Sequence, residues 1–139
     1  MTAKDFIPLN IIGRGAFGEV RLCRDKQSRK LVAVKKMKKS DMIDKQQIVH
    51  VKAEKDILAT AINPWIVDLH CSFKDNRYLY LVMEYLAGGD LMTLLMKKEI
   101  LSEEDSKFYM AEMVLAVESV HKMNYIHRDL KPDNILIDR

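Results

Sequence analysis

The chain has 139 residues, of which 48% are hydrophobic and 31% are charged, and its formal net charge is +3. These values are typical of a globular domain with a buried core, and they exclude an intrinsically disordered chain. The small net charge and the few aromatic residues do not favour nucleic acid as a partner. No run of about 18 apolar residues predicts a membrane span.

The N-terminal residues and the cysteines bear on location. Residues 1–5 contain no apolar signal region, and Thr2 occupies the position where myristoylation requires glycine. Cys23 and Cys71 are isolated in the sequence and belong to no Cys/His cluster that would predict zinc. We therefore expect a reducing compartment, the cytoplasm with the nucleus as the alternative, and both thiols as small core residues.

The first motif is a glycine-rich stretch that follows a predicted strand at residues 6–12. The spacing of Gly13, Gly15 and Gly18 lets backbone amides approach phosphate oxygens without an intervening side chain. The same spacing occurs in dinucleotide-binding folds, where a helix must follow the glycines. Here residues 20–24 alternate with the period of a strand. We therefore predict a flap that joins two antiparallel strands.

The third predicted strand, at residues 31–37, carries a lysine on an apolar face. Lys35 shares that face with Ala33 and Met37, since side chains alternate along a strand. A lysine in such a position needs an anionic partner. The alternative is that Lys35 only begins a basic run that extends to Lys39 and is solvated.

A helical pattern at residues 41–61 places a glutamate on its apolar stripe. Glu54 falls on the same face as Val51 and Leu58. A carboxylate there is costly unless it is paired, and Lys35 is the candidate partner. The alternative is a glutamate at the helix edge with a hydrated carboxylate, and the pattern alone leaves both open.

Two further strands are predicted at residues 66–69 and 78–83, which gives five strands. After the adjacent glycines 88 and 89 the sequence becomes helical, so this pair marks a hinge. We predict an α+β fold in which residues 1–86 form a five-stranded antiparallel sheet with one main helix. Residues 87–139 then contribute helices and a loop.

The helices of the second part have recognisable starts. Asp90 can cap a short helix through residues 91–97. Ser102 begins a sequence similar to a capping box and opens a long amphipathic helix to about residue 122. Four methionines in these helices are predicted to fill the core: Met92, Met96, Met110 and Met113.

Residues 127–134 combine two carboxylates, two cations, a histidine and an asparagine with Pro132, which disfavours a helix. Apolar runs at 125–126 and 135–137 flank this stretch, and they predict a loop held at both ends by buried strands. Catalytic groups are often found on such loops. The alternative is a polar surface turn.

The order of these motifs resembles the eukaryotic protein-kinase domain. A glycine flap, a Val-Ala-Val-Lys strand, a helix glutamate, a hinge and His-Arg-Asp-Leu-x-x-x-Asn follow one another along the whole chain from Phe6. Lys131 after His-Arg-Asp-Leu is similar to serine/threonine kinases. The strings at 13–20, 53–58 and 88–98 resemble the AGC group, and within it the NDR/LATS branch.

The resemblance implies ATP-dependent phosphoryl transfer with Mg²⁺ as a cofactor. Asp129 would accept the proton of the substrate hydroxyl, Lys131 would touch the γ-phosphate, and Asn134 would bind Mg²⁺. Lys35 would hold the α- and β-phosphates and pair with Glu54. The nucleotide-binding set would also contain Ile12, Gly13, Arg14, Gly15, Ala16, Phe17, Gly18, Val20, Ala33, Val67, Met83, Glu84, Leu86, Asp90 and Leu136.

The resemblance also distributes roles within that set. The glycines would cover the phosphates, with Phe17 at the flap tip. Met83 would be the gatekeeper, and the backbones of Glu84 and Leu86 would hydrogen-bond the adenine. Asp90 would reach the ribose or a basic substrate residue. The adenine would lie between apolar side chains: Ile12, Val20, Ala33 and Leu136, with Val67 beside them.

Two neighbours of the catalytic aspartate have implied roles outside chemistry. His127 is expected to be structural and packed under the loop. Arg128 would meet a phosphorylated activation loop, a charge-assisted contact that orders that segment. The implied partners are proteins with Ser or Thr substrate residues, an upstream activating kinase and a co-activator.

The 139 residues contain no Asp-Phe-Gly sequence, which follows the catalytic loop in this family. We therefore expect an incomplete catalytic domain that lacks measurable phosphotransfer by itself. The alternative is a non-catalytic module that binds nucleotide weakly or competes for the regulators of a kinase.

Overall fold

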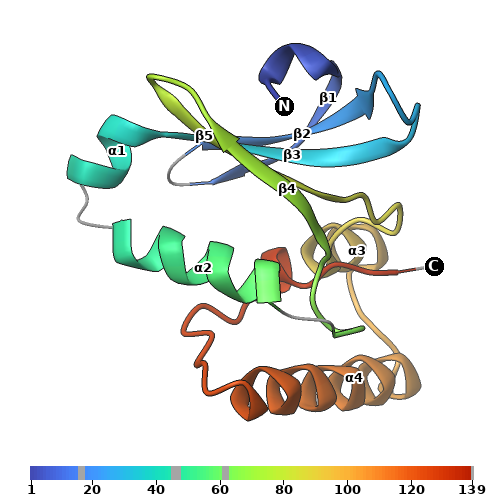
Figure 1. Ribbon diagram of the computed structural model, residues 1–139. Helices are drawn as coiled ribbons and strands as arrows, with labels where there is room; N and C mark the ends of the chain where they lie inside the picture. The colour runs from blue at the N-terminus through green and yellow to red at the C-terminus, as the bar shows by residue number, and fades with distance from the viewer. Residues whose placement is uncertain (16–17, 45–47, 61–62, 139) are drawn as a thin grey trace. The chain divides into compact units, whose positions relative to one another are not determined.

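The computed structural model describes residues 1–15, 18–44, 48–60 and 63–138. The chain forms two compact units. The first unit comprises residues 1–62 and 66–85 and contains the sheet, and the second comprises residues 63–65 and 86–139 (Figure 1). A short 3₁₀-helix, η1 (Ala3–Asp5), precedes the first strand.

The first unit is built on a sheet with the strand order β1-β2-β3-β5-β4, and all neighbouring strands are antiparallel. The strands are β1 (Phe6–Gly15), β2 (Gly18–Asp25), β3 (Leu31–Lys38), β4 (Leu69–Lys74) and β5 (Tyr78–Glu84). This confirms the predicted five-stranded sheet. A strand, not a helix, follows the glycines, which excludes the dinucleotide-binding arrangement.

Both faces of this sheet are covered by apolar side chains. One face carries a cluster that includes Val32, Val34 and Tyr80, with the Phe73 ring stacked on Tyr80 at 4.7 Å between centroids. On the other face, Met37 and Leu81 pack with Met42 and Val51 of the two helices α1 (Lys39–Asp44) and α2 (Ile48–Thr60). Alternation along β3 therefore places Lys35 on the face that α2 covers (Figure 1).

One predicted boundary in the first unit is wrong. The strand expected at 66–69 is mostly not a strand, because β4 begins only at Leu69. The backbone of Asp68 bonds instead with Glu84: its carbonyl accepts from the Glu84 N–H at 3.0 Å, and its N–H donates to the Glu84 carboxylate at 2.9 Å. The described residues of the helix expected at 41–61 belong to α1 and α2, and residues 45–47 and 61 lie outside the described part.

The second unit contains α3 (Leu91–Lys98), α4 (Glu103–Lys122) and the 3₁₀-helix η2 (Pro132–Asn134). Both predicted caps are present. The Asp90 carboxylate accepts from the Thr93 N–H at 2.7 Å, and the Ser102 hydroxyl accepts from the Asp105 N–H at 3.0 Å. These bonds satisfy N–H groups that have no partner within the first helical turn.

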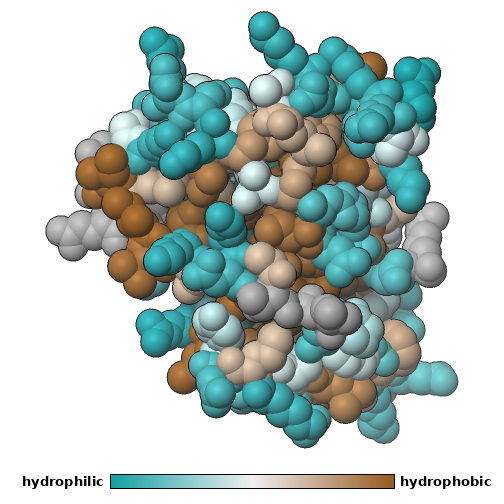
Figure 2. Space-filling view, in the orientation of Figure 1, coloured by the Kyte–Doolittle hydropathy of each residue, from teal (hydrophilic) through white to brown (hydrophobic). Residues whose placement is uncertain are grey.

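The expected burial of the second unit is only partly observed. No residue of α4, which is described in full, is buried, and Met96 and Met110 are exposed although core positions were predicted for them. Figure 2 shows apolar side chains among polar ones in the region of α4. The buried strands predicted around residues 127–134 are also wrong: Ile126 is exposed and outside any strand, and Leu136 makes only a single bridge, to Asp90.

Across the described ranges, no helix is both long enough and apolar enough to cross a lipid bilayer.

Candidate functional site

The first part of the candidate site is an ion pair on the α2-covered face of the sheet. Lys35 of β3 lies opposite Val20 of β2 and Leu81 of β5. Its Nζ donates a 2.6 Å hydrogen bond to Oε1 of Glu54 on α2. The side chains are 29% and 40% exposed, respectively, so the pair lies at the edge of the core, open to water.

This geometry confirms the predicted Lys35–Glu54 pair and rejects the alternatives of a solvated lysine and a hydrated glutamate without a partner. A half-exposed pair contributes about 0–1 kcal/mol to stability, so its position is more informative than its energy. Glu54 occupies one of the three ammonium donors. The others remain for an anionic ligand held at a fixed point on the sheet.

The glycine-rich flap is the hairpin between β1 and β2, in which Gly13 lies opposite Val20 and Gly15 opposite Gly18. A Cβ atom on Gly18 would overlap the carbonyl oxygen of Lys36, so close strand packing already requires this glycine. A Cβ atom on Gly15 would meet nothing within 4 Å. Packing therefore explains Gly18 but not Gly15, where a phosphate-binding role remains a separate explanation.

Three other predicted residues of the first unit share the face of Lys35: Val20, Ala33 and Met83. Ala33 lies opposite Met83 in the β3–β5 ladder, two residues from Lys35. Glu84 ends β5, and its N–H and carboxylate are both engaged by Asp68. Of its two backbone groups, only the carbonyl is then left to bind a ligand. Val67 lies before β4, outside the strands.

The flap tip and its flanks give less information. Ala16 and Phe17 lie outside the described residues. Arg14 faces Glu19 across the hairpin, but Glu19 bonds with Arg21 at 2.7 Å. This hydrogen bond holds the pKa of Glu19 below its usual value and raises that of Arg21. Ile12 lies on β1 and is exposed.

The second part of the candidate site is the loop at residues 127–134, which brings together the three residues predicted for chemistry. The Asn134 amide donates to Asp129 twice, to Oδ2 at 3.1 Å and to the backbone carbonyl at 2.9 Å. Lys131 Nζ lies 3.4 Å from the same carboxylate. The Asp129 side chain is 65% exposed, so its carboxylate is accessible to a substrate hydroxyl.

These contacts also orient Asn134. Because its Nδ2 faces Asp129, its Oδ1 is free to point elsewhere, and an amide oxygen is a hard, neutral ligand suited to Mg²⁺. Within the described part of the chain, no group of three or more His, Cys, Asp or Glu residues could hold a metal ion. The assignment of Asn134 to Mg²⁺ therefore stays a prediction.

The residues before Asp129 shape the loop. Arg128 has a φ of 65°, a left-handed conformation that costs a non-glycine residue roughly 1–2 kcal/mol. The His127 Nδ1 accepts a 3.3 Å hydrogen bond from the Asp129 N–H. His127 thus has a local structural role, but it is exposed and not packed under the loop as expected.

A contact that the sequence did not suggest connects this loop to the start of α3. Asp90 forms an antiparallel bridge with Leu136, while both oxygens of its carboxylate accept from Thr93. Leu86, Asp90 and Leu136 all belong to the second unit. Gly88, predicted only as part of a hinge, lies against Ile137. In the sequence, only the adjacent glycines 88 and 89 indicated a close contact at this position.

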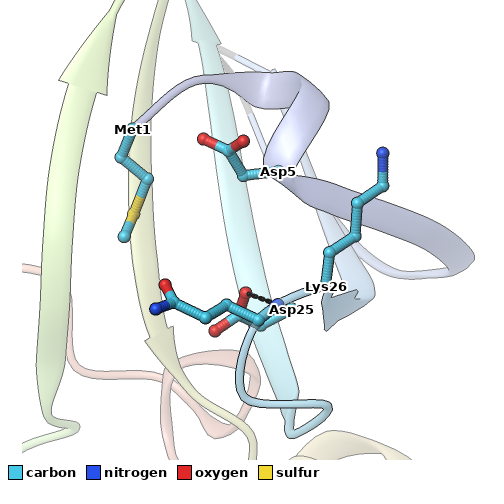
Figure 3. Close-up of a pocket in the computed structure, with 5 residues that line it drawn as sticks. Met1, Asp5, Asp25 and Lys26 are labelled. Carbon is cyan, nitrogen blue, oxygen red and sulfur yellow. Dashed lines mark hydrogen bonds between the residues drawn. The ribbon is translucent and has the colours of Figure 1, made fainter.

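A hollow of about 290 Å³ in the first unit is not part of the candidate site. Figure 3 shows Met1, Asp5, Asp25 and Lys26 around it. Its carboxylates serve local turns: Asp5 accepts from the Thr2 N–H at 2.7 Å, and Asp25 accepts from the Ser28 hydroxyl at 2.6 Å. The latter bond holds the pKa of Asp25 below its usual value. The hollow is therefore a consequence of turn structure.

Neither cysteine is a candidate nucleophile. Both are free, Cys23 buried and Cys71 half-buried, so only Cys23 is fully the core residue that was predicted. Burial raises the pKa of both thiols. A thiol with a raised pKa is protonated and unreactive near neutral pH.

Comparison with known proteins agrees with this geometry. A sequence profile of the protein kinase domain matches residues 6–139. Serine/threonine-protein kinase CBK1 of Yarrowia lipolytica is 55% identical over 139 residues, which is 100% of this chain and 24% of that protein. Serine/threonine-protein kinase tricornered of Drosophila pseudoobscura pseudoobscura is 53% identical over 135 residues, or 97% of this chain and 30% of that protein.

The chain spans less than a third of the length of these curated relatives. Both relatives are kinases of the NDR/LATS branch of the AGC group, in agreement with the strings at 13–20, 53–58 and 88–98. The profile match and the high identity over the whole chain lead to one conclusion: the chain belongs to the protein kinase family, among the serine/threonine kinases.

Proposed function

We propose that these residues are part of an enzyme that transfers the γ-phosphoryl group of Mg·ATP to serine or threonine hydroxyls of proteins. The observation that carries the proposal is the 2.6 Å hydrogen bond between Lys35 Nζ and Glu54 Oε1. It fixes a compact cation on an apolar sheet, and phosphoryl transfer depends mainly on such positioning and charge neutralisation.

In the first unit, Lys35 binds the α- and β-phosphates through the ammonium donors that Glu54 does not use. The backbone amides near Gly13 and Gly15 cover the phosphates, and open space at Gly15 supports this role. Ile12, Val20, Ala33 and Val67 contact the adenine, and Met83 is the gatekeeper. Glu84 hydrogen-bonds the base through its carbonyl oxygen.

In the second unit, Asp129 accepts the proton of the substrate hydroxyl as the nucleophile forms. Lys131 touches the γ-phosphate and offsets its charge. Asn134 binds Mg²⁺ through Oδ1, and the bound ion neutralises phosphate charge during transfer. Leu86, Asp90 and Leu136 contribute hinge, ribose and adenine contacts. The exposure of Asp129 and its hydrogen bonds from Asn134 support these assignments.

The proposed regulation and cellular location of the protein rest on its resemblance to the kinase family. We propose an upstream activating kinase and a co-activator as partners, with Arg128 meeting the phosphorylated activation loop. We also propose a cytoplasmic or nuclear location.

The test compares Lys35→Met with Lys36→Met in the full-length protein. Saturation with Mg·ATP at about 100 times Kd stabilises a binding protein by about 2.7 kcal/mol, which appears as a raised unfolding midpoint. We expect Lys35→Met to abolish this shift. Lys36→Met retains it, because the Lys36 ammonium lies 4.1 Å from the centroid of the Tyr78 ring and has no assigned nucleotide role.

Asp129→Asn completes the test. This variant retains the Mg·ATP shift and loses phosphotransfer to protein by at least about 10²-fold, the usual contribution of a general base. Equal midpoint shifts in the Lys35 and Lys36 variants would contradict the nucleotide site. Full activity of Asp129→Asn would contradict the assigned base.

A further inference from the structure

Two segments of the second unit form a short antiparallel clip, which we define as residues 88–91 and 135–137. The Leu91 N–H donates to the Ile135 carbonyl at 2.9 Å, and the Ile137 N–H donates to the Gly89 carbonyl at 2.8 Å. The bridge between Asp90 and Leu136 lies between these two bonds. Figure 1 shows the C-terminal segment passing beside α3.

The clip requires that Gly88 has no side chain. A Cβ atom there would overlap the carbonyl oxygen of Ile137, and it would lie 2.8 Å from the carbonyl carbon and 2.9 Å from the Cβ of the same residue. Two of these atoms belong to the backbone, so no side-chain rotation relieves the collision. Any larger residue at this position must displace the backbone of Ile137.

The adjacent glycine has a different cause. Gly89 has a φ of +77°, and a Cβ atom there would meet nothing within 4 Å. Asparagine adopts this left-handed conformation more readily than other non-glycine residues. An asparagine at position 89 therefore carries backbone strain but avoids the collision that it would meet at position 88.

The clip lies directly beside the proposed chemical groups. Asn134, at the end of η2, immediately precedes residues 135–137, and η2 packs against α3, which begins at Leu91. Asn134 in turn holds Asp129 through its two hydrogen bonds. On the N-terminal side of the 127–134 loop, residues 123–126 form no strand, and Arg128 has a left-handed conformation. The clip therefore holds the loop at its C-terminal end.

We propose that Gly88 is a positioning residue for phosphoryl transfer. By admitting the Ile137 backbone, it fixes Leu136 and Asn134, and through Asn134 it fixes the carboxylate of Asp129. The kinetic part of this inference rests on the proposed function, whereas the structural part does not.

The experiment uses Gly88→Asn and Gly89→Asn in the full-length protein, which place the same side chain at adjacent positions. Amide hydrogen exchange at Leu91 and Ile137 reports on the clip, and exchange of the Asn134 side-chain amide reports on its contact with Asp129. We expect exchange at least about tenfold faster in Gly88→Asn, and rates within about threefold of wild type in Gly89→Asn. Unchanged protection at Leu81 in the first unit and at Val114 within α4 shows that both units of the variant are folded.

The kinetic readout separates positioning from stability. Displacing catalytic groups by about 1 Å can cost about 10²-fold, so we expect Gly88→Asn to lower kcat at least about tenfold at saturating ATP, and Gly89→Asn to retain it. Gly88→Ala is the milder variant if the asparagine prevents folding, and the same results are expected of it.

The outcomes distinguish the two proposals. Unchanged exchange at Leu91, Ile137 and Asn134 in the Gly88 variants would overturn the inference, whatever their activity. Faster exchange with an unchanged kcat would remove the positioning role. Absence of Mg·ATP turnover in the wild-type protein would count against the proposed function alone, because the exchange result still decides whether Gly88 fixes Asn134.

Discussion

The two units achieve order in different ways. Among the described residues, every buried hydrophobic side chain except Leu91 belongs to the first unit, where apolar clusters cover both faces of the sheet. The second unit depends on helix caps, an ion pair between Lys98 and Asp105, and the clip between residues 88–91 and 135–137. Burial of apolar side chains stabilises the first unit, whereas hydrogen bonds and an ion pair stabilise the second.

The difference extends to the proposed functional groups. Lys35 lies on the central strand β3 and Glu54 on α2. The neighbouring side chains of both elements pack in one apolar cluster. Asp129 and Asn134 stand on an exposed loop and are held by hydrogen bonds to one another. A side chain positioned by packing is displaced when a neighbouring core residue is truncated. A side chain positioned by hydrogen bonds is displaced when one of its bonding partners moves.

The largest expected effect is that of Leu81→Ala in the first unit. Leu81 is 0% exposed and lies opposite Lys35 in the β3–β5 ladder. Truncation of a fully buried leucine leaves a cavity and costs about 2–5 kcal/mol of unfolding free energy. Urea denaturation measures this loss of unfolding free energy, and amide exchange in β3 and β5 shows whether it falls on the first unit.

Phe108→Ala on α4 is the matched truncation in the second unit. Phe108 is 59% exposed, so the change is expected within about 0.5 kcal/mol of wild type. A loss at position 108 as large as that at position 81 would show that the second unit also depends on a packed core. The comparison between the units would then fail.

Periodicity in the sequence made the Lys35–Glu54 pair a candidate, and the resemblance to protein kinases selected it over a hydrated glutamate. Each residue lies on the inward face of a strand or helix with a clear apolar pattern. Because an unpaired charge near a core is costly, two opposite charges on facing elements are expected to pair. The caps at Asp90 and Ser102 were predictable for a similar reason. A cap involves residues three positions apart, so the pattern contains both partners.

Other features could not be predicted, because they depend on contacts between distant segments. The β4 ladder begins at Leu69 because the Asp68 N–H donates to the Glu84 carboxylate and not to a backbone carbonyl. Gly88 is required because the Ile137 backbone passes over it. Neither contact leaves a periodic signal. The exposure of Met96 and Met110 is a further example, since an amphipathic pattern states which face is apolar and not what covers it.

Ser102→Ala tests the polar contacts of the second unit with an intermediate effect. Loss of the hydroxyl that accepts from the Asp105 N–H is expected to cost about 1 kcal/mol and to increase amide exchange in the first turn of α4. Ser106→Ala, one turn later, is the control, since alanine favours a helix interior. Equal destabilisation by both substitutions would contradict the capping role.

The smallest predicted effect compares two carboxylates, one in each unit, whose pKa values lie below the usual 3.8 for different reasons. The pKa of Asp105 is lowered by the Lys98 ammonium and by Ser102, whereas that of Asp75 is lowered mainly by the backbone N–H groups of Tyr78 and Arg77. Both carboxylates therefore stabilise the fold above pH 3.8, and their contributions are lost as pH falls through the lower pKa of the folded state.

Salt separates the two causes. Raising ionic strength from about 0.01 M to about 1 M shortens the screening length from about 30 Å to about 3 Å, which weakens an exposed ion pair more than it weakens bonds from fixed backbone groups. In a carboxyl NMR titration we expect the pKa of Asp105 to rise toward 3.8 with salt, while that of Asp75 changes less. Lys98→Met should raise the pKa of Asp105 at low salt and remove most of its salt dependence. A pKa of Asp105 that responds to salt as little as that of Asp75 would mean that fixed donors, not an ion pair, lower the pKa of both carboxyls.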